Sequence, residues 1–87
     1  MPVVGIPSLL RELTHGQNLI SIEGTNVREV IANLETCYPG IKERLCEGER
    51  LRPTISVVVD GLTSAAKLRH PLNEASEVHF VIAISGG

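Results

Sequence analysis

Aromatic side chains make up only 2% of this 87-residue chain, which has one tyrosine, one phenylalanine and no tryptophan. Basic residues are also few: eight Lys and Arg stand against ten Asp and Glu, giving a formal net charge of −2. Nucleic-acid-binding domains usually carry a basic patch with aromatic side chains that stack on bases. Nucleic acid is therefore not expected as a partner. The hydrophobic fraction of 43% still allows one core, filled by Val, Ile and Leu.

Membrane, disulfide and cofactor signals are missing as well. No stretch approaches the roughly 20 apolar residues that cross a bilayer, and the N-terminus lacks a charged-then-apolar secretion signal. We therefore expect no membrane partner and a cytoplasmic location. Two cysteines, Cys37 and Cys46, are too few for a disulfide scaffold, and their spacing matches no common zinc pattern. Without a His-Glu-x-x-His motif, P-loop or glycine-rich dinucleotide loop, the chain is expected to bind no metal or cofactor and to be no enzyme by itself.

The first third of the chain predicts a hairpin. Residues 3–10 have the character of a strand that Pro7 interrupts, because proline cannot donate to a strand ladder. Residues 14–18 have the composition of a turn. Residues 19–23 then alternate between apolar and polar, as a half-buried strand does.

The clearest helix of the chain follows this hairpin. Thr25 or Asn26 can cap its N-terminus, and Glu29 stands three residues after Asn26, as in a capping box. One apolar stripe repeats at helical spacing through Val27, Val30, Ile31, Leu34 and Tyr38. Pro39 predicts the end of the helix, because proline cannot continue the hydrogen-bond ladder. Residues 41–45 predict one more helical turn.

Strands dominate the rest of the chain. After a solvated loop at residues 47–50, residues 54–59 form a β-branched strand that Asp60-Gly61 ends. Residues 62–73 are ambiguous between a short strand and a turn of helix, and residues 78–84 form the last strand. One helix against these strands predicts an α+β fold of the β-grasp type. Its mixed sheet would have four to five strands, with the last strand at the centre.

The last strand is apolar on both faces. Its side chains Val78, Phe80, Ile82 and Ile84 point one way, and Val81 and Ala83 point the other way. One helix covers only one face of a sheet, so the second face would leave an exposed apolar patch, which usually marks a partner site. In the alternative arrangement, residues 62–73 fold over that second face.

The chain closes on Ser85-Gly86-Gly87. Two glycines have no side chains, so they can pass through a narrow slot and present a carboxylate to another protein. Three extended residues at about 3.3 Å each reach roughly 10 Å. We expect a single domain over residues 1–87 with a flexible tail at residues 85–87. The simpler alternative is an interaction domain whose Gly-Gly end has no role.

Several segments together resemble the ThiS/MoaD-type sulfur carriers, which are ubiquitin-like proteins of the β-grasp fold. The matching segments lie along the whole chain: Leu9–Leu13 with Gly16, Asn26–Ile31, Val57–Gly61, His70–Leu72, Glu77-Val78 and Gly86-Gly87. Residues 6–11 and 34–45 are most similar to the carriers that feed sulfur to cysteine synthesis. Carriers that donate sulfur to other metabolites, including siderophores, are a related possibility. The chain lacks the family's usual Asp-Gly-Asp turn and the proline late in the last strand, which leaves its pathway open.

The resemblance implies a role for the tail and a set of partners. An adenylating enzyme of the ThiF/MoeB type would use ATP and magnesium to activate the carboxylate of Gly87 and then convert it to a thiocarboxylate. Gly86, Ser85, Ile84, Ala83 and Val81 would contact that enzyme. A downstream synthase would accept the sulfur, and a processing protease that exposes Gly87 is a further partner of such carriers. Two alternatives share this tail chemistry: the small subunit of a molybdopterin-type synthase, and a ubiquitin-like protein modifier.

Overall fold

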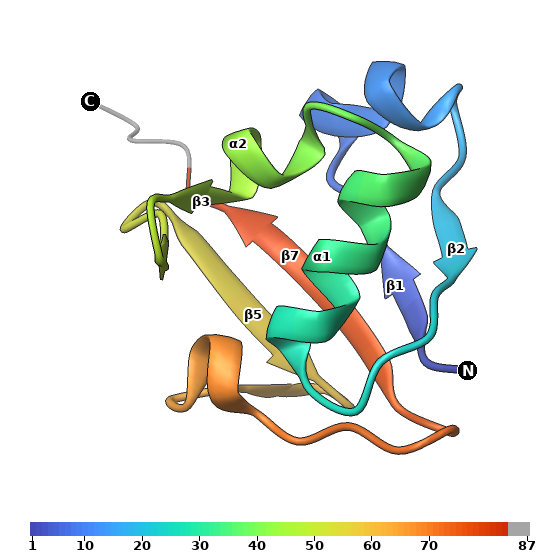
Figure 1. Ribbon diagram of the computed structural model, residues 1–87. Coiled ribbons are helices and arrows are strands. Elements are labelled where there is room, and N and C mark those ends of the chain that lie inside the picture. The colour runs from blue at the N-terminus through green and yellow to red at the C-terminus, as the bar shows by residue number, and fades with distance from the viewer. Residues whose placement is uncertain (84–87) are drawn as a thin grey trace.

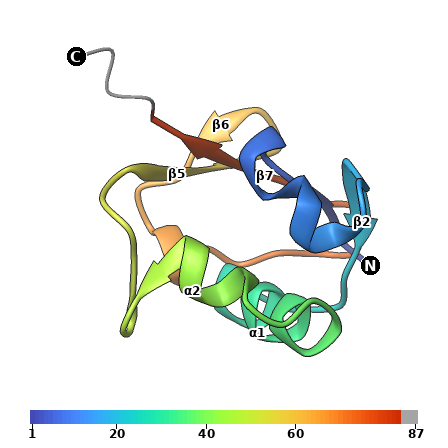
Figure 2. The same cartoon turned by 90° about the horizontal axis from the view of Figure 1, so that it is seen from above.

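The computed structural model describes residues 1–83 and consists of a sheet with two helices packed against one face (Figures 1 and 2). The sheet has the strand order β2-β1-β7-β5-β6. Its strands are β1 (Val3–Gly5), β2 (Leu19–Ser21), β5 (Ile55–Val59), β6 (Leu62–Thr63) and β7 (Glu77–Ile82). Strand β7 is central, parallel to β1 and antiparallel to β5. The predicted β-grasp fold, with a mixed sheet and the last strand at its centre, is confirmed.

The segment after β1 is a correction to the sequence prediction. The strand ends at Gly5, and residues Ser8–Thr14 form a 3-10 helix, η1, rather than more strand. Pro7 explains the change: it has no N–H to give to a neighbouring strand, and its carbonyl accepts from the N–H of Leu10 at 2.9 Å. The chain then reverses at His15 and Gly16, and β2 pairs antiparallel with β1 as expected.

Helix α1 (Val27–Cys37) begins where the capping signal predicts. The Asn26 side chain accepts from the N–H of Glu29 at 2.8 Å, and the Glu29 carboxylate accepts from the N–H and hydroxyl of Thr25, each at 2.7 Å. These two Thr25 donors, the backbone N–H first, hold the pKa of Glu29 below its usual value. The helix ends before Pro39, and α2 (Ile41–Leu45) supplies the predicted extra turn.

Short elements precede and follow β5. Residues 47–50 are exposed, but β3 (Cys46–Glu47) and β4 (Arg50–Leu51) pair as a small separate hairpin, which corrects the prediction of a loop. Asp60 and Gly61, both at positive φ, form the tight turn between β5 and β6. The ambiguous stretch contains both structures: strand β6 and a 3-10 helix, η2 (Lys67–Arg69).

The core lies between the sheet and α1. Four residues of the predicted helical stripe are buried, since Val27, Val30, Ile31 and Leu34 are each at most 2% exposed, whereas Tyr38 follows the end of α1 and is half-buried. From the sheet side, Val4, Val57, Val78 and Phe80 contribute side chains that are at most 3% exposed. Aliphatic residues therefore fill the core almost alone, as the composition requires.

Candidate functional site

Strand β7 divides its side chains between the core and an open face. Val78 and Phe80 are 0% and 3% exposed, whereas Val81 is 48% exposed and His79 is half-buried. Side chains alternate between the two faces of a strand, so Val81 and His79 point away from α1. We call the sheet surface that α1 and α2 leave uncovered the open face. Val81, one of the predicted partner-binding residues, lies on it.

Other apolar side chains continue the open face beside β7. Leu19 on β2 is 57% exposed, because it alternates with the buried Ile20. A shallow hollow of about 260 Å³ lies between them, lined by Gly5, Ile6, Pro7, Arg11, Asn18, Leu19, His79, Phe80 and Val81. Sequence reasoning did not single out Leu19, although its position out of phase with Ile20 was the available signal. Leu19 and Val81 provide the exposed apolar surface that a protein partner can cover.

His79 occupies the middle of the open face and depends on Gly5. Its ring lies directly over Gly5, where an added Cβ would collide with the His79 Nδ1 atom. Its Nε2 atom lies 2.8 Å from the Oε1 atom of Glu77 on the same strand. Gly5 is therefore required by the close approach of a side chain from the neighbouring strand, a contact between residues 74 positions apart that no local pattern indicates.

Residues 62–73 do not cover the open face. Strand β6 extends the sheet at its edge, and η2 packs against α1 and β4 on the helix side. Leu68 of η2 is 8% exposed within the core, and the N–H of Leu72 donates to the Thr25 carbonyl at 2.8 Å. The alternative in which this stretch shields the second face of the sheet is therefore wrong.

The described structure ends at Ala83, one residue after β7. The N–H of Ala83 donates to the carbonyl of Thr54 at 2.7 Å, so the strand is held at its last described residue, where Ala83 itself is exposed. Ile84, Ser85, Gly86 and Gly87 lie outside the described residues. Their roles, like those of Ala83 and Val81 in binding a partner, stay predictions.

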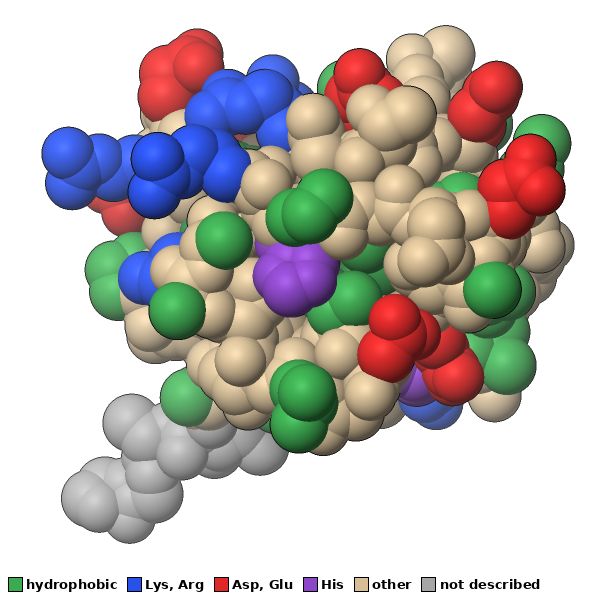
Figure 3. Space-filling model, turned by 90° about the horizontal axis from the view of Figure 1, so that it is seen from below, with side chains coloured by type: hydrophobic (Ala, Val, Ile, Leu, Met, Phe, Trp, Pro, Cys, Tyr) green, Lys and Arg blue, Asp and Glu red, His purple; other side chains and the backbone are tan. Residues whose placement is uncertain are grey.

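Charged side chains are spread unevenly over the surface. Seen from below, the Lys and Arg side chains gather mainly on one side, and most carboxylates lie on the other (Figure 3). Within residues 1–83 two Arg–Glu ion pairs form, Arg28–Glu49 at 3.2 Å and Arg52–Glu47 at 3.7 Å, and a third contact joins His79 to Glu77 at 2.8 Å. All three involve substantially exposed side chains, so each stabilises the fold only weakly.

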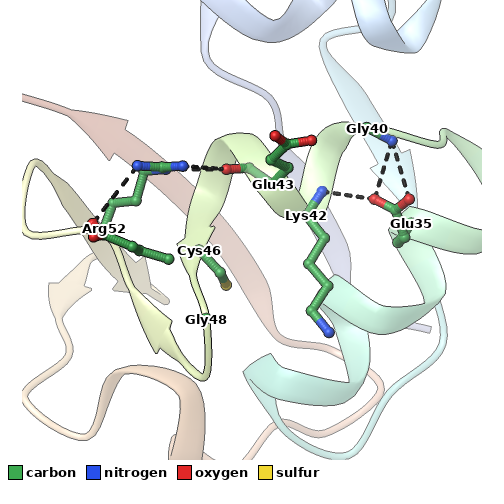
Figure 4. Close-up of a pocket in the computed structure, with 8 residues that line it drawn as sticks. Glu35, Gly40, Lys42, Glu43, Cys46, Gly48 and Arg52 are labelled. Atoms are coloured by element: carbon green, nitrogen blue, oxygen red, sulfur yellow. Dashed lines mark hydrogen bonds and ion pairs between the residues drawn. The ribbon is translucent and has the colours of Figure 1, made fainter.

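A second hollow beside α2 contains charged groups that serve the fold (Figure 4). The Glu35 carboxylate accepts from the N–H of Lys42 at 2.9 Å and of Gly40 at 3.1 Å, and these bonds, Lys42 first, lower the pKa of Glu35. Arg52 donates through Nε and Nη2 to the carbonyl of Glu43 at 3.0 and 2.8 Å. Burial raises the pKa of the Cys46 thiol, which disfavours the reactive thiolate.

Residues 1–83 contain no group of three or more His, Cys, Asp or Glu side chains placed to hold a metal ion. No helix among them is both long and apolar enough to cross a membrane.

Comparison with known proteins connects this geometry to a family. The model of the ThiS family matches residues 4–87. The sulfur carrier protein CysO of Mycobacterium tuberculosis is 30% identical, with 97% of this chain and 96% of that protein covered. CysO in the crystal structure of the Amycolatopsis orientalis BexX/CysO complex is 28% identical, with a TM-score of 0.91 over the whole of both chains. The small archaeal modifier protein 1 of Methanosarcina acetivorans, at 23% identity and a TM-score of 0.84 over 99% and 95% of the two chains, shares the fold. The chain, whose last strand is the central one of a ubiquitin-like sheet, belongs to the ThiS family.

Proposed function

We propose that this chain is a sulfur carrier whose Gly87 is adenylated by a partner enzyme and converted to a thiocarboxylate that donates sulfur in biosynthesis. The observation that carries the proposal is the match of the ThiS family model through residue 87, the second of the two terminal glycines. Full-length similarity to proteins named sulfur carriers supports it. That similarity favours cysteine synthesis as the destination of the sulfur, with another sulfur metabolite as the alternative.

The chemistry at Gly87 explains why a partner is needed. An α-carboxyl group has a reference pKa of about 3.3–3.7, so it is an anion at neutral pH and resists nucleophilic attack. In the proposed reaction a carboxylate oxygen attacks the α-phosphorus of ATP, and pyrophosphate leaves. Hydrosulfide then attacks the acyl carbon, a C–S bond forms, and the C–O bond to AMP breaks. ATP and magnesium would be bound by the adenylating enzyme, of the ThiF/MoeB type, and not by this chain.

The structure around β7 suits a protein that must present its tail. Strand β7 has a hydrogen-bonded neighbour on each side, β1 and β5, and the Ala83 N–H is held by Thr54. Ala83, the residue that precedes the tail in sequence, is thus fixed relative to the open face. Leu19 and Val81 on that face would supply apolar contact with the adenylating enzyme, offsetting the entropy of ordering the tail, about 1–2 kcal/mol per residue.

Partners of three kinds follow from the proposal. The adenylating enzyme would load the sulfur, and a downstream synthase would accept it. The similar structure of CysO in complex with BexX supports the general idea that such carriers bind other proteins. A protease that trims a longer precursor to Gly87 remains a third proposed partner.

Loading of Gly87 can be tested directly by intact mass spectrometry. The purified chain is incubated with its adenylating enzyme, ATP, magnesium and sulfide, and the mass should rise by one oxygen-to-sulfur exchange. Gly87→Ala should abolish this change, because a Cβ next to the carboxylate would collide with a narrow adenylation channel. The unfolding midpoint of that variant should equal that of the wild type, which separates lost loading from lost folding.

Cys37→Ala is the matched control for the site of sulfur attachment. Cys37 is an exposed free thiol, and a persulfide on it, which would need a sulfane-sulfur donor or an oxidant besides sulfide, adds a sulfur atom without loss of oxygen. We expect the Cys37→Ala protein to be loaded like the wild type. Loading that disappears with Cys37, or that persists at the wild-type rate in Gly87→Ala, would contradict the proposal.

A further inference from the structure

A hollow of about 620 Å³ lies at the junction of α1, β4 and η2. It is lined by Arg28, Glu49, Arg50, Leu51, Pro53, Ala65, Ala66, Lys67, Leu68 and Arg69. We call it the basic hollow, because four of its five charged side chains are cations. Its members come from segments far apart in the sequence, and none of them belongs to β7.

The charge of the basic hollow is opposite to that of the whole chain. Its lining carries a net charge of +3, whereas the chain carries −2. Its single carboxylate, Glu49, is paired with Arg28 at 3.2 Å. Arg50, Lys67 and Arg69 are exposed and form no ion pair within residues 1–83. Three cations are therefore available to an anionic partner.

Apolar side chains also line the basic hollow. Leu51 and Leu68 are 7% and 8% exposed, and Pro53, Ala65 and Ala66 are the other apolar lining residues. No aromatic side chain is among the lining residues, so the hollow offers no surface on which bases could stack. A lining that combines cations with apolar side chains fits a protein segment in which carboxylates flank an apolar side chain.

Lys67, one of the cations that line the hollow, has a backbone conformation that is uncommon for residues other than glycine. Lys67 has a φ of +52°, a conformation that glycine adopts at lower cost. The Ser64 hydroxyl accepts from the Lys67 N–H at 3.1 Å, and the Lys67 carbonyl accepts from the His70 N–H at 3.1 Å. These bonds hold a lysine in the lining of the hollow in a position where the backbone alone would favour glycine.

We propose that the basic hollow is a second docking surface, which binds an acidic segment of a protein partner. Carboxylates of that segment would lie over Arg50, Lys67 and Arg69, and an apolar side chain would rest on Leu51 and Leu68. Binding at this surface does not depend on sulfur loading at Gly87. Pro53 of the lining directly precedes Thr54, whose carbonyl accepts from the N–H of Ala83, the last described residue.

The probe is a capped synthetic peptide of four glutamates around one leucine, titrated into the isotopically labelled chain at low salt. Amide shifts should change around the basic hollow and not on the open face. Binding should weaken several-fold when ionic strength rises to about 0.15 M, because exposed charge pairs are screened. A triple variant, Arg50→Gln, Lys67→Gln and Arg69→Gln, should weaken binding about 3- to 100-fold, if each exposed pair contributes as such pairs usually do.

Controls decide whether the surface is selective. Arg44→Gln removes an exposed arginine outside the hollow and should leave binding unchanged, whereas Arg50→Gln alone should weaken it. Lys67→Gly removes the same charge as Lys67→Gln, and glycine adopts the positive φ of this position at low cost. Weaker binding by this variant therefore reports the lost charge and not misfolding. The proposal is overturned by no binding, by equal binding of a glutamine peptide, or by an unchanged triple variant. Tighter binding of a single-stranded oligonucleotide of equal charge would also overturn it, in favour of a nucleic-acid surface.

Discussion

Alanine variants of Val78 and Val81 test directly which face of β7 is covered. The two valines lie three residues apart on one strand and therefore point to opposite faces. Val78 is 0% exposed in the core, and Val81 is 48% exposed on the open face. Replacing each with alanine removes the same atoms from the two environments, so the two variants control for each other.

The expected losses of stability differ clearly. Valine to alanine removes two methylene equivalents, each worth about 0.8 kcal/mol when buried. For Val78 that gives about 1.6 kcal/mol, and the cavity left behind raises the loss in the free energy of unfolding to about 2–3 kcal/mol. For Val81, half-exposed, the loss should be about 0.8 kcal/mol at most. At about 4–8 °C per kcal/mol for a domain of this size, Val78→Ala should lower Tm by roughly 8–24 °C.

Urea unfolding followed by far-ultraviolet circular dichroism measures both variants, since the chain has no tryptophan to report by fluorescence. A second assay measures the KM of each variant with the adenylating enzyme, well below its unfolding temperature. Val81→Ala should raise KM, and Val78→Ala should leave it near the wild-type value. Equal destabilisation by the two variants would refute the reasoning, because it would mean that the face carrying Val81 is covered within the folded chain.

Three further predictions concern packing, capping and acid stability. Gly5→Ala should cost about 1–3 kcal/mol of stability through its clash with His79; His79→Ala in the same protein should restore most of this loss in urea unfolding, and no recovery would contradict the contact. Asn26→Ala should cost about 1 kcal/mol and accelerate amide hydrogen exchange in the first turn of α1, because the side chain that accepts from Glu29 N–H is lost; unchanged exchange would argue against the cap. The pKa of Glu35 is lower in the folded chain than its ordinary value of 4.5, so its stabilising effect is present above that pH and is lost as the pH falls below it. Glu35→Gln should therefore flatten the decrease in urea midpoint below pH 4.5, and an unaltered acid profile would count against this role.

Local signals in the sequence predicted the boundaries of several elements correctly. Asn26 and Glu29 mark the start of α1 and Pro39 marks its end, because capping and the loss of a backbone donor act within one or two turns. Asp60 and Gly61 mark the turn after β5, because few residues adopt positive φ without cost. Such signals succeed since all the interacting atoms lie close together along the chain.

The candidate tail was predicted from residues that the structure does not describe. Gly87 and the three residues before it remain a hypothesis from the sequence and the family match. The exposed position of Val81 follows from simple alternation along β7, and the exposed position of Leu19 was available from the same rule on β2. What alternation could not show was whether residues 62–73 cover that face.

Composition, alternation and capping were enough to define an α+β chain with an aliphatic core and its last strand at the centre of the sheet. Folding in three dimensions was needed to turn residues 8–14 into a 3-10 helix, to place His79 over Gly5, and to assemble the basic hollow. In each of the last two cases the contact joins residues separated by tens of positions. Contacts of that kind depend on how whole elements pack, because their free energy comes from burial and charge proximity that exist only once the sheet and helices have come together.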